Sequence, residues 1–189
     1  LAFFAGCIPR RELVLPAQDG IYLKTRTIVV DNKNNCVVST TAKAAVKDFM
    51  SGLACSQAVL AAFADRYGLS REHALRLAAA FEGGTAMQAD ACGALVSVYL
   101  VLGLEYGGVD PEDMDAKHKT AEKVREAAKR FAERNQGHTD CRDLIDCDIS
   151  QPEGLETALE KELFQRRCPR FVRDAVQVAE ELLNMEDSE

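Results

Sequence analysis

The chain has 189 residues, of which 47% are hydrophobic and only 6% aromatic, with a formal net charge of −7. A chain of this length can bury one good hydrophobic core, so a single domain with an appended segment is expected. Residues 1–50 carry 7 Lys and Arg against 4 Asp and Glu, whereas residues 51–189 carry 16 against 26. Because a phosphate backbone attracts clustered Lys and Arg, this acidic body argues against nucleic acid as a partner.

The longest apolar stretch, from Ala91 to Leu104, is too short to span a bilayer, so no membrane span is predicted. The chain starts LAFFAGC, and FAGC at Cys7 loosely resembles a lipoprotein cleavage box. A basic n-region and a full apolar h-region are missing there. We therefore expect a cytoplasmic protein, with an exported or lipid-anchored form as the alternative.

Residues 1–40 differ in character from the remainder of the chain. IYLKTRTIVV and CVVST are rich in β-forming residues and are separated by DNKNN, a turn-forming cluster. This pattern predicts a small N-terminal β-hairpin or extended segment, placed before a helical domain over residues 41–189.

From Thr41 onward the apolar residues recur at helical spacing. The first helical stretch ends at Gly68, and Gly52 is a point at which it can split in two. Ser70 is a predicted N-cap for the next helix, which Gly83-Gly84 ends. Cys92 then opens a long apolar helix that closes at Gly107-Gly108.

The second half of the chain continues the helical pattern. Asp110-Pro111-Glu112 predicts a helix start with Pro at the first helical position, and this helix extends to Arg134. CRDLIDCD, from Cys141, is a predicted short helix, and Pro152 begins a helix that reaches Arg167. The last helix is predicted to have Cys168 at its cap and Pro169 in its first turn. The fold class is therefore all-α, a compact multi-helix bundle of six to eight helices.

The 7 cysteines are dispersed and form no CxxC pair. Cys92, Cys141 and Cys168 share a predicted position at a helix start, where free N–H groups and the helix dipole favour the thiolate. Such a thiolate is a nucleophile or a ready metal ligand. Cys55 is predicted to lie inside a helix, with an apolar face toward the core. Burial as small hydrophobic side chains is the alternative explanation for each of these cysteines.

Five local signatures in order resemble the redox-active C-GCAxxG-C-C family of prokaryotes. They are Cys55-Ser56-Gln57-Ala58-Val59, Gly83-Gly84, Cys92-Gly93-Ala94, Cys141-Arg142-Asp143-Leu144 and Cys168-Pro169. The resemblance covers residues 43–185. One position departs from it, because Ser97 stands where the family motif has a closing glycine. The same domain is similar to part of the split-Soret cytochromes, which carry an iron–sulfur centre and haem; this chain has no CxxCH for covalent haem.

The resemblance implies that Cys55, Cys92, Cys141 and Cys168 are the functional cysteines. We consider three functions for them. The first is an iron–sulfur cluster held by the four thiolates for electron transfer. The second is thiol–disulfide chemistry, in which two of the four cycle between dithiol and disulfide. The third is a structural zinc site made of the same four thiolates.

The expected partner is an electron-transfer protein or an oxidoreductase, and a homodimer is compatible with the sequence. Cys147 is an additional cysteine that could substitute for one of the four, while Cys7 and Cys36 lie outside the resemblance. Cys141 and Cys147 would fall on different faces of one regular helix, so they pair only if the helix breaks between them. His138, three residues before Cys141, is a further candidate ligand, with a solvated turn residue as the alternative. No catalytic triad or phosphate loop is found.

Overall fold

The computed structural model describes residues 38–184. Within that range the chain is all-α, which confirms the predicted fold class. It forms eight α-helices and two 3₁₀-helices, labelled η. The elements are α1 (Thr40–Met50), α2 (Cys55–Phe63), η1 (Ala64–Tyr67), α3 (Arg71–Ala78), η2 (Ala79–Phe81), α4 (Gly93–Tyr106), α5 (Met114–Arg134), α6 (Cys141–Ile145), α7 (Pro152–Glu160) and α8 (Leu163–Asn184). The predicted N-terminal hairpin falls mostly on residues before this range.

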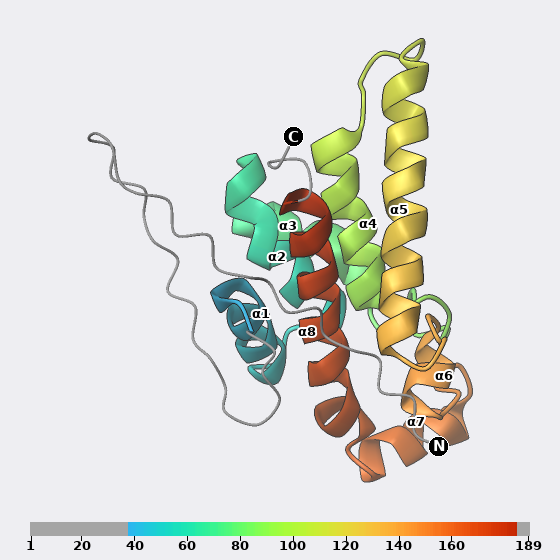
Figure 1. Ribbon diagram of the computed structural model, residues 1–189. Coiled ribbons are helices and arrows are strands. Elements are labelled where there is room, and N and C mark those ends of the chain that lie inside the picture. Colours follow the sequence, from blue (N-terminus) through green and yellow to red (C-terminus); the bar gives the residue numbers. More distant parts are fainter. Residues whose placement is uncertain (1–37, 185–189) are drawn as a thin grey trace, which may run out of the picture. The chain divides into compact units, whose positions relative to one another are not determined.

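The helix α4 is the centre of the bundle, and it packs against α2, α5 and α8 (Figure 1). Its apolar residues surround the helix axis on all sides, as the run GALVSVYLVLGLEY suggests, and Leu95, Val98, Val101 and Leu102 are fully buried. A helix that is apolar all round must be covered by other helices. The longest apolar run of the sequence is therefore the buried centre of the bundle. Among residues 38–184, no helix could cross a membrane.

The helix α5 covers α4 with one apolar stripe and exposes the rest. Ala127 and Phe131 are buried, while most of its Lys, Arg and Glu residues face solvent. Its N-cap is Asp113, whose carboxylate accepts a hydrogen bond from the backbone N–H of Ala116. The prediction that Pro111 occupies the first helical position is therefore wrong. Pro111 lies in the turn before the helix, and the cap three residues further on fixes the start.

The division between α1 and α2 confirms that Gly52 interrupts the first helical stretch. Gly52 has φ of +109°, a conformation that favours glycine, and the backbone N–H of Leu53 donates to the carbonyl of Asp48. The chain restarts as α2 at Cys55. The prediction that Cys55 lies inside a helix is wrong for this reason, because the break at Gly52 makes Cys55 the first helical residue.

The helix α8 begins earlier than the sequence predicts. Its first backbone hydrogen bonds include the one from the N–H of Arg166 to the carbonyl of Glu162, so the helix is already formed before Cys168. Pro169 lies inside the helix rather than in its first turn. The predicted cap at Cys168 is wrong because a proline removes only one helical hydrogen bond, and the buried face that includes Phe171, Val172 and Val176 outweighs that loss.

The segment that precedes α8 contains two short helices. The helix α6 ends at Ile145, and Asp146 adopts a left-handed conformation with φ of +53°. The helix α7 has Pro152 at its first turn, as predicted, but it ends at Glu160 instead of continuing to Arg167.

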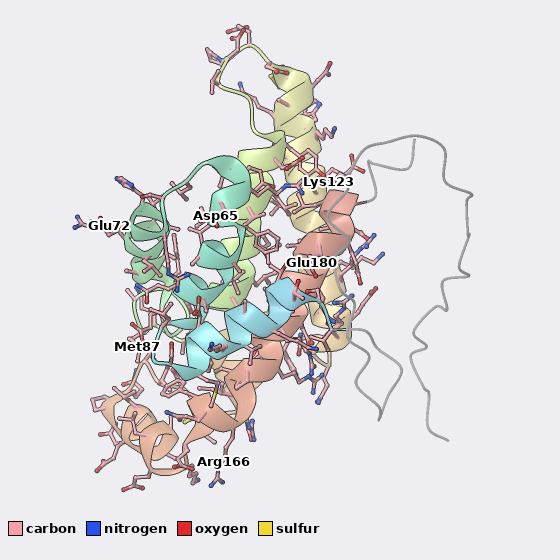
Figure 2. All side chains as sticks on the ribbon, turned by 90° about the vertical axis from the view of Figure 1, so that its left-hand side faces the viewer. Asp65, Glu72, Met87, Lys123, Arg166 and Glu180 are labelled. Carbon is pink, nitrogen blue, oxygen red and sulfur yellow. The ribbon has the colours of Figure 1, made fainter. Side chains whose placement is uncertain are left out.

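Side chains fill the space between the helices, and charged residues such as Glu72 and Arg166 project from the surface (Figure 2).

Candidate redox site

Three of the four predicted site cysteines lie at helix starts. Cys55 and Cys141 are the first residues of α2 and α6, and Cys92 is the N-cap residue of α4. Cys168 lies inside α8. Cys92, Cys141 and Cys168 are buried, Cys55 is half-buried, and all four are free thiols.

The four thiols come from four different helices and converge on the same buried region. The Cys55 sulfur acts electrostatically on the thiols of Cys92, Cys141 and Cys168, and Cys141 acts on those of Cys92 and Cys168. Such mutual influence requires that the side chains lie near one another in a medium with little water to screen them. We call these four residues the cysteine cluster.

Cys55 and Cys92 form the pair of the cysteine cluster whose thiols are hydrogen-bonded to each other. This bond lowers the pKa of Cys55, against the opposing effect of its burial. The same bond and burial raise the pKa of Cys92 well above that of an ordinary thiol. The pair therefore consists of a Cys92 S–H donor and a Cys55 sulfur on which negative charge is stabilised.

Backbone N–H groups from two helix starts also point at the Cys55 sulfur. The N–H groups of Ser56, in α2, and Ala94, in α4, donate hydrogen bonds to it and lower its pKa further. The sequence-based prediction that the start of α4 activates Cys92 is therefore wrong. The N–H of Leu95 does donate to Cys92, but the hydrogen bond to Cys55 and burial outweigh it. The activated thiol is Cys55, which receives the favourable N–H groups of both helices.

The two remaining thiols are held in the neutral form. Burial, reinforced by the charge of Cys55, raises the pKa of Cys141 to about 12. Burial also raises the pKa of the Cys168 thiol strongly. Tyr99 of α4 shares this environment, since its burial and the nearby Cys92 raise the pKa of its hydroxyl to about 12.

Gly93 allows the start of α4 to approach Cys55. A Cβ atom at Gly93 would lie 2.2 Å from the carbonyl oxygen of Phe81 and 3.1 Å from the sulfur of Cys55. The first distance is shorter than any real contact of a methyl group. The glycine after Cys92 is therefore needed for close packing at the site.

A backbone junction joins the loop before α4 to the start of α6. The N–H of Cys92 donates to the carbonyl of Thr139 at 2.9 Å, and the N–H of Cys141 donates to the carbonyl of Asp90 at 2.7 Å. Ala91 and Asp140 form an isolated antiparallel bridge between these two bonds. We call residues 88–92 and 139–142 the junction; it places two cysteines of the cluster on directly paired segments.

Two buried serines join the helices around the site: Ser97 bonds α4 to α2, and Ser56 bonds α2 to α3. Ser97 donates its hydroxyl to the carbonyl of Ser56 at 2.8 Å, and Ser56 donates its own to the carbonyl of Ala78 at the same distance. Both serines are fully buried. Sequence analysis identified Ser97 only as a departure from the family motif; nothing in the sequence indicated that its hydroxyl bonds α4 to α2.

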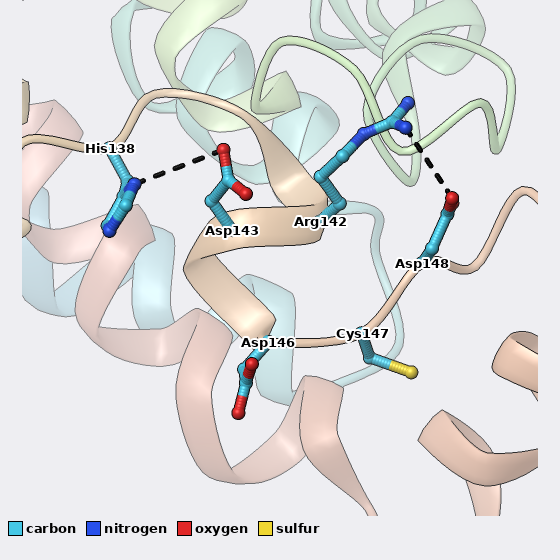
Figure 3. Close-up of a pocket in the computed structure, with 6 residues that line it drawn as sticks. All are labelled: His138, Arg142, Asp143, Asp146, Cys147 and Asp148. Atoms are coloured by element: carbon cyan, nitrogen blue, oxygen red, sulfur yellow. Dashed lines mark hydrogen bonds and ion pairs between the residues drawn. The ribbon is translucent and has the colours of Figure 1, made fainter.

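Cys147 also acts electrostatically on the Cys141 thiol, but Cys147 and His138 line the surface around α6 and are not counted in the cysteine cluster. The helix breaks between Cys141 and Cys147, and the Cys147 thiol donates to the carbonyl of Gly154 at 3.2 Å. His138 is half exposed and faces Asp143, with 3.9 Å between Nδ1 and Oδ2. Both residues line a surface pocket around α6, where Figure 3 also shows the ion pair of Arg142 with Asp148.

The four thiols of the cysteine cluster match, in type and number, the usual ligands of iron–sulfur clusters and of structural zinc. As the side chains stand, no group of three or more His, Cys, Asp or Glu in residues 38–184 is arranged to hold a metal ion. The cysteine cluster thus brings four free thiols together, and three of them, Cys92, Cys141 and Cys168, are held in the protonated form.

A family model described as "Putative redox-active protein (C_GCAxxG_C_C)" matches residues 53–182. This match covers more than half of the chain, and the chain belongs to the C_GCAxxG_C_C family. All four residues of the cysteine cluster fall within the matched range. No curated protein and no solved structure matches the chain.

Proposed function

We propose that this redox-active family member uses Cys55, Cys92, Cys141 and Cys168 to hold an iron–sulfur cluster for electron transfer. The single observation that carries the proposal is the convergence of four thiols from four helices on one buried region. Each of these cysteines lies on a separate element, so four distant segments of the chain fold together to form this ligand set. Four thiolates are the usual ligand set of such clusters.

The protonated state of the thiols is compatible with this proposal. Metal binding to thiols displaces their protons, so ligand thiols can be protonated before the metal binds. Cys55 is the thiol most ready to lose its proton, whereas Cys92, Cys141 and Cys168 resist ionisation. We expect Cys55 to bind first and binding to release protons from the other three.

The surrounding residues would tune and protect the centre. A bound cluster would supply one-electron transfer, at a potential set by hydrogen bonds to the sulfurs and by solvent access. The N–H groups of Ser56, Ala94 and Leu95 donate to two of the sulfurs. Burial of three of the four cysteines excludes water. The half-buried Cys55 is the side from which an electron-transfer protein or an oxidoreductase would exchange electrons.

A second candidate is thiol–disulfide exchange by Cys55 and Cys92, which their hydrogen bond favours. In this reaction the Cys55 thiolate attacks a sulfur of a partner disulfide and expels one partner thiolate. Cys92 then loses its proton, attacks the mixed disulfide and releases the second partner thiolate. The net result is a Cys55–Cys92 disulfide, with two electrons and two protons transferred to the partner dithiol.

Anaerobic purification followed by visible absorption and by iron, sulfide and zinc analysis tests the proposal. Broad visible absorption bands with stoichiometric iron and sulfide are expected. A colourless, metal-free protein that loses two free thiols on mild oxidation would replace the first proposal by the second. Zinc without iron would contradict both and indicate a structural metal site.

A further inference from the structure

Arg142 is the side chain that bonds the two paired segments of the junction together. It follows Cys141 directly in α6 and is turned toward the loop before α4. Its Nε donates to the carbonyl of Ala89 at 3.1 Å, and its Nη2 donates to the carbonyl of Gln88 at 2.9 Å and to Oδ1 of Asp90 at 2.8 Å. Its backbone N–H also donates to the carbonyl of Ala89.

The loop that Arg142 holds contains unfavourable backbone conformations. Thr85, Ala86, Met87 and Ala89 all have φ between +52° and +62°, in the left-handed region that side chains with a Cβ adopt at a cost. A strained segment keeps its conformation only when the surrounding structure holds it. Three carbonyl or carboxylate acceptors on consecutive residues, all bonded to one guanidinium, supply such a constraint.

The position of Cys92 depends on this loop. Cys92 comes two residues after Asp90, and its N–H is bonded to Thr139, two residues before Cys141. A movement of residues 88–90 away from α6 would therefore separate the Cys92 thiol from the Cys141 thiol. The remaining bond of Arg142 goes outward, to Asp148 at 3.5 Å.

We propose that Arg142 is a positioning residue that fixes the Cys92 and Cys141 thiols relative to each other and thereby sets the redox behaviour of the cysteine cluster. The planar guanidinium is essential to this role, because its rigid fork bonds several acceptors at once, whereas a lysine ammonium is a single point charge. The claim that Arg142 sets the redox behaviour rests on the proposed function. The claim that Arg142 positions the two thiols does not.

The test compares Arg142→Lys and Arg142→Gln in the full chain. In the reduced, metal-free protein we expect both variants to raise the rate at which iodoacetamide alkylates Cys92 and Cys141 by about tenfold, as measured by mass spectrometry, since each loses charged hydrogen bonds. Hydrogen exchange at the amides of these two cysteines should accelerate with it. In the loaded or disulfide-forming protein the midpoint potential should shift in both variants. For a tenfold change in the equilibrium the shift is about 60 mV in a one-electron cluster couple and about 30 mV in the two-electron disulfide couple.

Two control variants separate positioning from charge and from general loosening. Asp148→Asn removes the charge of the outward ion pair, leaves the bonds of Arg142 to residues 88–90 in place, and should leave alkylation and potential unchanged. Arg71→Gln removes a comparable bond between elements, from Arg71 to Asp48 at 2.7 Å, away from the cysteines, and should also leave them unchanged.

Several results would overturn the proposal. If Arg142→Lys matches the wild type while Arg142→Gln does not, charge alone matters and the fork has no positioning role. If neither variant changes alkylation, the thiols are held without Arg142. A change in alkylation with an unaltered potential would refute the effect on redox behaviour. A wild-type protein without cluster or disulfide would refute the proposed function, while the alkylation and exchange rates still decide whether Arg142 positions the thiols. Should one variant not fold, the other and Asp90→Ala, which removes the single side-chain acceptor of Arg142 in the loop, are measured in the same way.

Discussion

The bundle formed by α4, α5 and α8 and the region around the cysteine cluster are built by different means. In the bundle, regular helices pack through apolar stripes, and polar bonds such as that from the Tyr106 hydroxyl to the carbonyl of Leu182 and the ion pair of Arg134 with Glu181 are added to them. Around the cysteines, backbone N–H and carbonyl groups of loops and helix starts make most of the specific contacts. The bundle therefore supplies most of the stability of this protein, whereas irregular backbone positions the cysteines.

Among the substitutions that test this division between stability and positioning, Gly93→Ala is expected to have the largest effect on the free energy of unfolding. The new methyl group would overlap the carbonyl oxygen of Phe81 and crowd the Cys55 sulfur, so we expect a loss of about 3 kcal/mol in the free energy of unfolding. Loss of the cysteine pair or of its cofactor should accompany it. Urea denaturation with thiol and iron analysis measures both effects.

Gly103→Ala is the matched control, because Gly103 lies on the same helix with open space around its Cβ position. Here we expect a small gain, about 0.5–1 kcal/mol, since alanine favours a helix interior over glycine. If both variants behave alike, close packing at the start of α4 is not what Gly93 provides.

A substitution that changes only a cysteine of the site should leave the helical bundle folded. We expect Cys92→Ser to abolish cluster binding or the redox step, because it removes one of four ligands and the partner of Cys55. Helical content measured by circular dichroism should stay nearly unchanged, since serine fills almost the same volume. Cys147→Ser, outside the cysteine cluster, should retain full cofactor content. A Cys92→Ser variant with full cofactor content and activity would show that the site assignment is wrong.

The buried thiols should make the stability of the reduced, metal-free protein fall in alkaline solution. Cys92, Cys141 and Cys168 have raised pKa values in the folded state, so the unfolded chain releases these protons first. Their contribution is fully present below the ordinary thiol pKa of about 9 and is lost as the pH rises toward 12, at about 1.4 kcal/mol per pH unit for each thiol.

Thermal unfolding at pH 8, 9 and 10 measures this dependence. The Cys141→Ser variant should show a shallower decline above pH 9 than the wild type, since it lacks one of the three thiols. Equal slopes in the two proteins would mean that the Cys141 thiol is not shielded from ionisation by the fold.

The smallest effect is expected from Ser97→Ala, which removes the hydroxyl bond from α4 to the carbonyl of Ser56. We expect a loss of about 1 kcal/mol, the net contribution of one buried hydrogen bond. Ser51→Ala is the control, because Ser51 donates a similar bond to the carbonyl of Asp48 at an exposed site. Chemical denaturation of both variants tests whether the buried serine matters more. Equal losses would indicate that Ser97 is only a small residue that replaces glycine.

The sequence by itself determined much of this protein. Apolar spacing, the break at Gly52, the cap at Ser70 and the end at Gly107 are local signals, and the all-α fold followed from them. The identity of the candidate cysteines also came from the sequence, through the family signatures around Cys55 and Cys92.

Only the tertiary structure decided which of these cysteines is activated and how far α8 extends. The start of α8 depends on burial of a long apolar face, which overrides the signal of Pro169. Activation of Cys55 depends on N–H groups of two helices that lie far apart in the sequence, together with the Cys92 thiol. Hydrogen bonds between distant segments act only after the chain has folded, and local sequence patterns cannot reveal them.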